Sequence, residues 1–145
     1  NNKINFVSIK NIKQKIHKFD YLIIACPLNE ETKDMINLKL IKNMKKNAII
    51  INVARGPIIN EADLYIALKN KLIRGAIIDV WYNYPQNGSS KKLYPSKYPL
   101  HQLDNVTLSP HSSAWSHQLW DRRFKFICEN LENLYNNRRL KNIVS

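Results

Sequence analysis

The sequence predicts an α/β domain in which a parallel sheet is flanked by helices. Short runs of β-branched and other apolar residues begin near residues 21, 48, 75 and 106, about one strand–helix unit apart. Helical patterns separate these runs, and successive units of this kind give parallel strands with right-handed connections. The chain has 145 residues, 44% of them apolar, which is enough for a real hydrophobic core.

The chain begins with a predicted helix and a predicted strand. Ser8 is expected to cap a helix whose apolar side chains recur at steps of three and four residues: Ile9, Ile12, Ile16 and Phe19. A strand over residues 21–26 follows and stops at Pro27. Thr32 is then expected to cap a short helix marked by Leu40, Ile41 and Met44.

The rest of the chain is organised around the second strand, residues 48–53. Its run of β-branched residues predicts a strand buried on both faces. It leads into Arg55, and the Gly56–Pro57 pair then stops it. An arginine at the carboxyl end of a parallel strand stands where open α/β sheets bind ligands, and its guanidinium suits a carboxylate. A nearby acid or a helix C-terminus would suit it equally well.

The later elements continue the alternation. Residues 60–63 resemble a capping box, and the helix they open is expected to bury Leu64, Ala67 and Leu68. A third strand covers residues 75–80. Residues 81–104 show no lasting period, and a loop this long in a compact domain is usually functional or mobile.

A fourth strand, residues 106–109, closes at Pro110 and His111, and a helix follows it. That last helix is expected to fray near Asn136 and to bury one face, formed by Leu119, Trp120, Phe124, Ile127, Leu131 and Leu134.

Composition restricts the class of protein. No apolar run approaches the roughly 20 residues of a membrane span, and the first residues lack the apolar region of a secretory signal. Cys26 and Cys128 show no metal-ligand spacing, so we expect no metal site and a reduced, cytoplasmic setting. The net charge of +12 would suit nucleic acid or an anionic surface. The lysines are scattered and do not cluster with aromatic residues, so we favour a solvated surface without a nucleic-acid or membrane partner.

The predicted topology gathers chemically active residues. Because the carboxyl ends of parallel strands share one edge, it brings together Cys26–Pro27, Ala54–Arg55, Asp79 and Ser109–His111. His111 is either an acid–base group or a structural residue. Asp79 lies in an apolar strand, where a carboxylate must be hydrogen-bonded, either as a local cap or as a ligand contact.

A glycine-rich turn is missing from the sequence. A nucleotide-binding sheet of this type should carry such a turn after its first strand. The chain has three glycines, Gly56, Gly75 and Gly88, and none of them lies in such a turn. The chain is therefore not a dinucleotide binder, or it is only the later part of one.

Four segments resemble the D-isomer-specific 2-hydroxyacid dehydrogenases in order and spacing: residues 20–32, 52–57, 75–80 and 109–111. The resemblance spans nearly the whole chain and covers the second half of that family's Rossmann-type nucleotide-binding domain. It implies that residues 1–145 are a partial NAD(P)-binding domain without the glycine-rich half and the substrate domain. We expect such a fragment to be inactive by itself.

The resemblance also implies an activity, in which hydride passes between nicotinamide and C2 of a 2-oxo or D-2-hydroxy acid. Arg55 corresponds to the arginine that holds the substrate carboxylate, His111 to the acid–base group, and Asp79 to the residue that meets the nicotinamide carboxamide. The implied cofactor is NAD, with NADP open, and the implied assembly is a homodimer of the full-length protein. Besides these three residues, the implied cofactor positions are Cys26, Pro27, Thr32, Val53, Ala54, Ser112, Ser113 and Ala114.

One position departs from the family. Tyr84 stands where the family usually has a glutamate paired with the histidine, and no carboxylate lies between Trp81 and Leu103. Tyrosine is neutral at pH 7 and supplies no negative charge. If the whole enzyme uses His111, we expect reduction to fail at a lower pH than with a glutamate.

Two alternatives follow from the resemblance. The formate dehydrogenase branch also lacks the glutamate, and Asp79–Trp81 is similar to that branch. A non-catalytic, NAD-sensing binding protein on the same scaffold is the other alternative, and the presence of both Arg55 and His111 argues against it.

Overall fold

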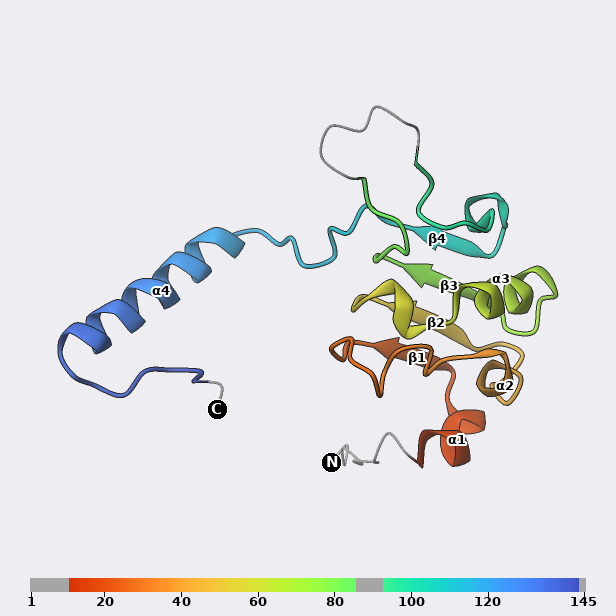
Figure 1. The fold of residues 1–145 in the computed structure, drawn as a ribbon, viewed down its shortest axis with the longest axis horizontal. Coiled ribbons are helices and arrows are strands. Elements are labelled where there is room, and N and C mark those ends of the chain that lie inside the picture. Colours follow the sequence, from red (N-terminus) through yellow and green to blue (C-terminus); the bar gives the residue numbers. More distant parts are fainter. Residues whose placement is uncertain (1–10, 86–92, 144–145) are drawn as a thin grey trace. The chain divides into compact units, whose positions relative to one another are not determined.

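The computed structural model describes residues 11–85 and 93–143, and the chain divides into two compact units. The first unit ends at Ser112 and contains the sheet, and the second begins at Ser113 and contains one long helix. Figure 1 follows the chain through both units. Ser8 and Ile9 of the first predicted helix lie outside the described residues.

Four parallel strands form the sheet, in the order β1-β2-β3-β4 (Figure 1). Their bounds are Tyr21–Ile24 for β1, Ile49–Asn52 for β2, Gly75–Ile78 for β3 and Val106–Leu108 for β4. Each strand begins close to its predicted start and ends earlier than its apolar run. The α/β fold with a parallel sheet is therefore confirmed.

Short helices precede and connect the strands of the first unit. The α-helices are α1 (Ile12–Lys15), α2 (Leu38–Ile41) and α3 (Glu61–Lys69), and the 3-10 helices are η2 (Ile16–Lys18), η3 (Gly56–Ile58) and η4 (Leu100–Gln102). Helix α3 buries Leu64, Ala67 and Leu68, as predicted. In the loop after β3, η4 is the only helical segment among the described residues.

The caps differ in part from those predicted. The Asn37 side chain caps α2 by accepting from the Leu40 N–H at 3.1 Å, so the prediction that Thr32 caps this helix is wrong. At α3, Asn60 accepts from the Asp63 N–H at 3.1 Å, which is half of a capping box. The Asp63 carboxylate does not reach back to Asn60; it accepts from the Leu38 N–H at 2.8 Å and ties the two helices together.

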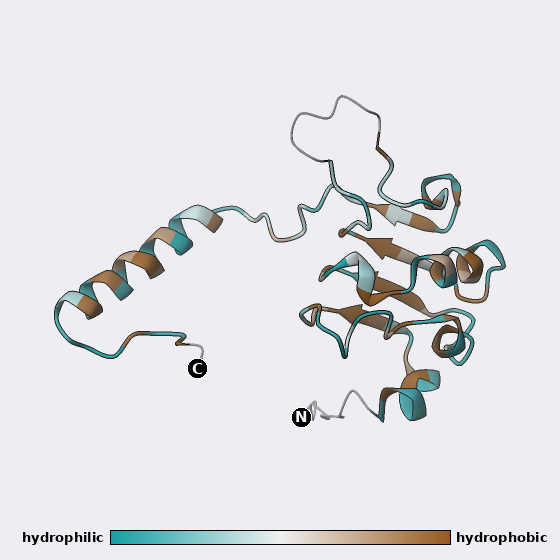
Figure 2. Cartoon of the chain, in the orientation of Figure 1, coloured by the Kyte–Doolittle hydropathy of each residue, from teal (hydrophilic) through white to brown (hydrophobic). Residues whose placement is uncertain are grey.

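The hydrophobic core lies on one face of the sheet. Leu22, Ile50 and Ala76 are paired across the sheet and buried, together with the apolar side chains of α2 and α3. Figure 2 shows the apolar strands beside these helices. Strands added in one direction by right-handed connections place their helices on the same face, which explains the one-sided core.

The other face of the sheet is largely uncovered in this chain. Tyr21 is 62% exposed, Ile23 63% and Ile77 40%. The prediction of a strand buried on both faces is therefore wrong for β2, whose Ile49 and Ile51 are only half-buried. A run of β-branched residues predicts a strand, but burial of its second face also requires helices on that side of the sheet.

Helix α4 (Leu119–Tyr135) forms most of the second unit. Its apolar stripe is exposed: Trp120 by 58%, Phe124 by 60%, Ile127 by 50%, Leu131 by 59% and Leu134 by 61%. The prediction of a buried face is wrong, because the described part of this unit contains no second element of comparable size. Lys141 folds back on the helix through hydrogen bonds to Asn130 and an ion pair with Glu129 at 2.8 Å, which lowers the pKa of Glu129.

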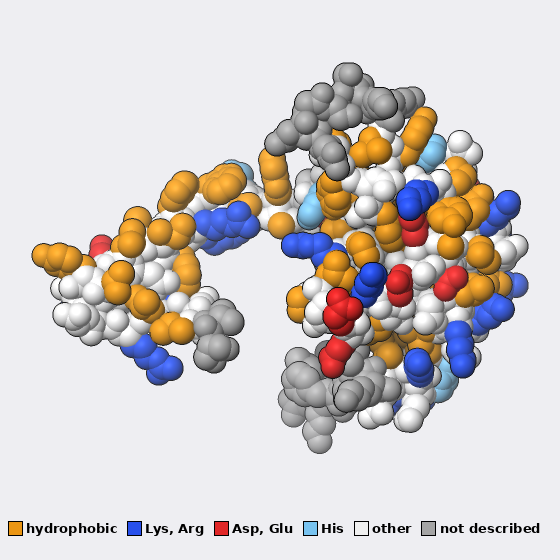
Figure 3. All heavy atoms as spheres, viewed as in Figure 1, with side chains coloured by type: hydrophobic (Ala, Val, Ile, Leu, Met, Phe, Trp, Pro, Cys, Tyr) orange, Lys and Arg blue, Asp and Glu red, His pale blue; other side chains and the backbone are white. Residues whose placement is uncertain are grey.

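The basic side chains of the folded chain are the next feature of its surface. The lysine and arginine side chains are spread over the visible face rather than gathered in one patch (Figure 3). Among the described residues, no helix combines the length and the apolar character needed to cross a membrane.

Candidate functional site at the carboxyl edge of the sheet

The carboxyl ends of the four strands lie level with one another. The register aligns Ile24 with Asn52, Asn52 with Ile78, and Ile78 with Leu108. Backbone hydrogen bonds continue one residue further, from the N–H groups of Val53, Asp79 and Ser109 to the preceding strand. The loops that carry Arg55, Asp79 and His111 therefore leave the sheet side by side, as the sequence predicts.

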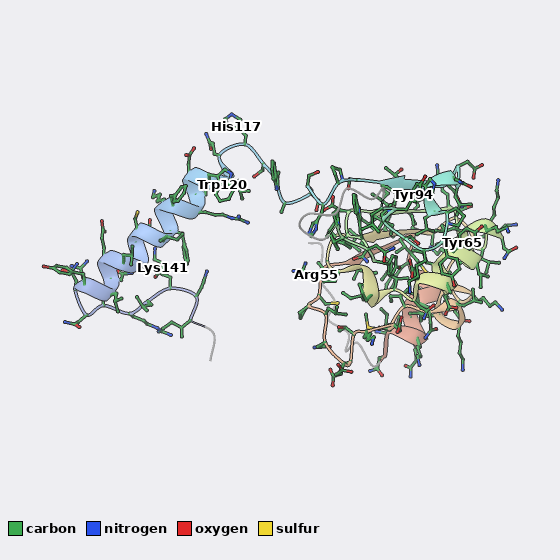
Figure 4. The ribbon with its side chains drawn as sticks, turned by 45° about the horizontal axis from the view of Figure 1, so that its top comes forward. Arg55, Tyr65, Tyr94, His117, Trp120 and Lys141 are labelled. Carbon is green, nitrogen blue, oxygen red and sulfur yellow. The ribbon has the colours of Figure 1, made fainter. Side chains whose placement is uncertain are left out.

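Asn52 shapes the loop that carries Arg55. This fully buried amide accepts from the Ala54 N–H at 3.1 Å and donates to the Arg55 carbonyl oxygen at 2.9 Å. The Arg55 side chain is exposed, with Nη1 donating to the Ala54 carbonyl oxygen at 2.6 Å. Figure 4 shows Arg55 at one end of the unit and Tyr65 of α3 toward the other. The guanidinium keeps further N–H donors for an anion, because it carries five.

Asp79 is buried, with 2% of its surface exposed, and binds the loop after β4. Its Oδ1 accepts from the Ser109 hydroxyl and, at 2.9 Å, from the Ser112 N–H. Of the two roles left open by the sequence, a local cap is present in the structure. The contact with a nicotinamide carboxamide stays a prediction.

His111 stands in the short turn between these two serines. Its φ of 58° lies in the left-handed region, which is uncommon for a residue other than glycine. Such a backbone persists where its surroundings hold it, and it is often found at functional sites. Asp79 bonds on both sides of His111 hold this turn, and the imidazole remains exposed.

Tyr84 contacts His111 directly. The Tyr84 hydroxyl lies 3.0 Å from His111 Nδ1 and accepts from the Trp81 N–H at 3.0 Å. The indole of Trp81 stacks on Tyr84 and donates to the Ser109 carbonyl oxygen at 2.9 Å. Thus Tyr84 and Trp81, both neutral, add to the links that Asp79 makes between the loops after β3 and β4.

The loop after β1 contributes the remaining early positions. Thr32 is 5% exposed, and its hydroxyl donates to the Pro27 carbonyl oxygen and accepts from the Asn29 N–H, both at 2.8 Å. Thr32 therefore fixes the fold of this loop. Cys26 is half-buried and Pro27 is exposed at the same edge.

The other predicted cofactor positions are distributed over both units. Val53 is 38% exposed, Ala54 is buried, and Ser112 is half-buried in the first unit. Ser113 and Ala114 belong to the second unit.

Gly56 is a further position that shapes the edge. A Cβ on Gly56 would overlap the backbone of Trp81, so the loops after β2 and β3 touch at this point. The sequence alone did not single out the roles of Asn52, Gly56 and Trp81. A polar residue at the end of an apolar strand was the available signal for Asn52, as it was for Asp79.

A separate cleft of about 450 Å³ lies beside the start of α3. It is lined by Lys33, Asp34, Asn60, Glu61 and Tyr82, among others, and by none of the predicted catalytic residues. The Tyr82 hydroxyl donates to the Ile59 carbonyl oxygen at 3.0 Å. Burial raises the pKa of Tyr82, and the nearby carboxylates of Glu61 and Asp34 raise it further.

Comparison with known proteins agrees with this arrangement. Residues 2–113 match the family described as "D-isomer specific 2-hydroxyacid dehydrogenase, NAD binding domain". The chain is 34% identical over 120 residues to a glyoxylate reductase of Korarchaeum cryptofilum, covering 83% of this chain and 34% of that protein. The chain thus spans about a third of the length of this relative.

Solved structures of similar fold contain nicotinamide cofactors. A D-isomer specific 2-hydroxyacid dehydrogenase of Xanthobacter autotrophicus Py2, in complex with NADPH, matches with a TM-score of 0.76 at 27% identity, covering 97% of this chain and 54% of that one. The NAD complex of a dehydrogenase of the same name from Lactobacillus delbrueckii ssp. bulgaricus matches with a TM-score of 0.78 at 25% identity, covering 92% and 42%.

Proposed function

Because this chain belongs to the D-isomer specific 2-hydroxyacid dehydrogenase family, we propose that the whole protein is a nicotinamide-dependent oxidoreductase of small 2-oxo and D-2-hydroxy acids. The observation that carries the proposal is the common edge to which parallel strands bring Arg55, Asp79 and His111. Arg55 and His111 are both exposed on loops that leave this edge, so each side chain is accessible to a small acid.

Arg55 holds the substrate carboxylate in this proposal. Its guanidinium is exposed and uses Nη1 for the Ala54 carbonyl oxygen, which leaves donors for a two-point contact with a carboxylate. The same positive charge polarises the adjacent carbonyl group of a 2-oxo acid. The role is one of positioning and electrostatic stabilisation.

His111 transfers the proton. With Nδ1 bound to Tyr84, Nε2 is the ring nitrogen left for the substrate. The cationic imidazolium gives its Nε2 proton to the carbonyl oxygen in reduction, and the neutral imidazole with Nε2 unprotonated takes the hydroxyl proton in oxidation. The turn fixed by Asp79 sets the position from which the imidazole acts.

In this proposal the nicotinamide ring packs on apolar surface at the edge of the sheet. Pro27 and Val53 offer exposed apolar surface there, and Arg55 and His111 lie on loops of the same edge. We propose that these residues hold NAD or NADP, with Cys26, Ala54, Asp79 and Ser112 shaping the surrounding loops. When bound, the nicotinamide supplies or accepts the hydride.

We also propose that this chain is the later part of an NAD(P)-binding domain. The family match to an NAD-binding domain and the coverage of about a third of a relative's length support this proposal. A glycine-rich turn encoded upstream of Asn1 would agree with it. The homodimer implied by the resemblance stays a prediction, which the molar mass of the whole protein in solution tests.

Steady-state kinetics of the whole protein test the activity. We expect oxidation of NADH or NADPH in the presence of one or more 2-oxo acids from a panel. Arg55→Ala should lower kcat/KM roughly 30-fold or more, the equivalent of about 2 kcal/mol. Arg74→Ala is the matched control, because Arg74 is exposed at the amino end of β3 and should leave kcat/KM unchanged. Cofactor binding without turnover of any 2-oxo acid would favour the NAD-sensing alternative.

A further inference from the structure

The pair of Tyr84 and His111 has a defined hydrogen-bond geometry. The phenol oxygen lies 3.0 Å from His111 Nδ1. The centroids of the two rings are 5.7 Å apart, and the ring planes are tilted by 52°. The same oxygen accepts the Trp81 N–H at 3.0 Å, and the Tyr84 ring stacks on that of Trp81 at 5.9 Å. Tyr84 is therefore held from one side and contacts the imidazole from the other.

The partners of Tyr84 favour one direction for its hydroxyl proton. The backbone N–H of Trp81 can only donate, so it occupies a lone pair of the phenol oxygen. The phenol O–H is then available to donate, and accepting one hydrogen bond polarises it toward giving another. The unprotonated nitrogen of a neutral imidazole is a better acceptor than a phenol oxygen. The favoured arrangement has the Tyr84 O–H donating to His111 Nδ1.

We propose that Tyr84 is a positioning residue that selects the tautomer of neutral His111, with the imidazole proton on Nε2. This inference rests on the proposed function only where it assigns Nε2 to the substrate. Nε2 makes no hydrogen bond with any residue that the structure describes, and the imidazole is exposed, so Nε2 is accessible from solvent.

This tautomer has a chemical consequence. Neutral His111 presents an N–H donor to a carbonyl oxygen, which suits binding of a 2-oxo acid. To act as a base, the ring must carry its proton on Nδ1 and leave Nε2 free. The Tyr84 O–H must then rotate away, and Nδ1–H becomes the donor to the phenol oxygen. A carboxylate at position 84 would act in the opposite way, because it only accepts hydrogen bonds and holds the proton on Nδ1.

Nitrogen NMR of the whole protein, labelled with ¹⁵N at histidine, tests this inference without any turnover. Spectra are recorded at about pH 9, where a histidine with an ordinary pKa is neutral. The His111 signals are assigned by their loss in His111→Gln, and the exposed His17 serves as the internal reference. We expect His111 to be almost entirely the Nε2–H tautomer, above the fraction shown by His17.

Two variants show whether position 84 is the cause. Tyr84→Phe keeps the ring and removes the hydroxyl, so His111 should relax to the tautomer mixture of His17. Tyr84→Glu should invert the tautomer to Nδ1–H. Backbone amide spectra of both variants check that the fold is retained.

The outcomes are distinguishable from those of the proposed function. A wild-type His111 that is mainly Nδ1–H, or a tautomer ratio that Tyr84→Phe and Tyr84→Glu leave unchanged, would overturn the inference whatever the activity. The expected tautomers in a protein that turns over no 2-oxo acid would support the inference and remove the proposed function instead.

Discussion

Asp79 Oδ1 accepts a hydrogen bond from the backbone N–H of Ser112 at 2.9 Å, linking the loop after β3 to the turn after β4. The same oxygen accepts from the Ser109 hydroxyl, so one buried carboxylate holds the turn on both sides of His111. The left-handed backbone of His111, with φ at 58°, is thus held by a residue far from it in sequence. The position of the His111 imidazole therefore depends on Asp79, which follows the neighbouring strand β3.

Asp79→Ala should release this turn. Loss of the acceptor leaves the Ser112 N–H and the Ser109 hydroxyl without their partner, at a cost of about 1–3 kcal/mol. Hydrogen exchange of the Ser112 amide is the measurement, and its protection should fall while that of Ile50 in β2 stays. Asp104→Ala is the control, because Asp104 is 77% exposed and pairs with Lys71 at 3.4 Å. Unchanged protection of Ser112 in Asp79→Ala would contradict the assigned role.

Gly56→Ala should disturb the contact between the loops after β2 and β3. The added Cβ overlaps the Trp81 backbone, which is not a flexible side-chain end, so one loop must shift. We expect a loss of stability of about 1–3 kcal/mol, measured by urea unfolding. Ala62→Ser, at a half-buried position of α3, serves as a substitution of similar size. A Gly56→Ala protein as stable as wild type would show that the loops approach less closely.

Tyr82 makes the stability of the folded chain depend on pH, and the sign of this dependence follows from the direction of its pKa shift. Its pKa is raised in the folded chain, so its contribution to stability is present below the unfolded pKa of about 10 and is lost as pH rises above it. Tyr82→Phe removes this titration and the hydrogen bond to Ile59, at a cost of about 1 kcal/mol at pH 8.

Urea midpoints at about pH 8 and pH 11 measure the effect. Wild type should lose about 1.4 kcal/mol per pH unit above pH 10 relative to Tyr82→Phe, so the difference between the two proteins should close and then reverse. A constant difference across this range would show that Tyr82 ionises equally in the folded and unfolded chains.

Tyr84→Glu should extend reduction to higher pH. The Tyr84 phenol contacts the His111 imidazole directly, and the Asp79 carboxylate accepts from the N–H of the neighbouring Ser112. A carboxylate at position 84 favours the charged imidazole, so the alkaline limit of kcat/KM for reduction should rise by about 1 pH unit. Tyr84→Phe adds no charge and should move that limit much less. An equal shift in both variants would assign the effect to lost packing.

The sequence was sufficient for the positions and the parallel direction of the strands. Apolar runs at a regular spacing predicted the parallel sheet, and the sheet placed the loops of Arg55, Asp79 and His111 at one edge. The prediction of a parallel sheet succeeded because the alternation of strands and helices, and the handedness of their connections, follow from short stretches of sequence. Burial was less predictable: the exposed Ile23 and the exposed stripe of α4 depend on which segments pack against them.

The contacts within the site were beyond a reading of the sequence. The sequence showed that Tyr84 could not replace the charge of a glutamate, but not that its hydroxyl would lie 3.0 Å from His111 Nδ1. Likewise, Asp79 was expected to need hydrogen bonds, without its partners being known. Such contacts require the relative placement of two loops, which single-residue propensities do not contain.

The central claim is that Arg55 and His111 act on one small acid at the carboxyl edge of the sheet. A crystal structure of the whole protein with NADH and oxamate, an unreactive analogue of a 2-oxo acid, tests it most directly. We expect the oxamate carboxylate to contact the Arg55 guanidinium and its carbonyl oxygen to lie within hydrogen-bond distance of His111 Nε2. Oxamate bound away from both side chains, or bound by one of them with the other turned to solvent, would contradict the claim.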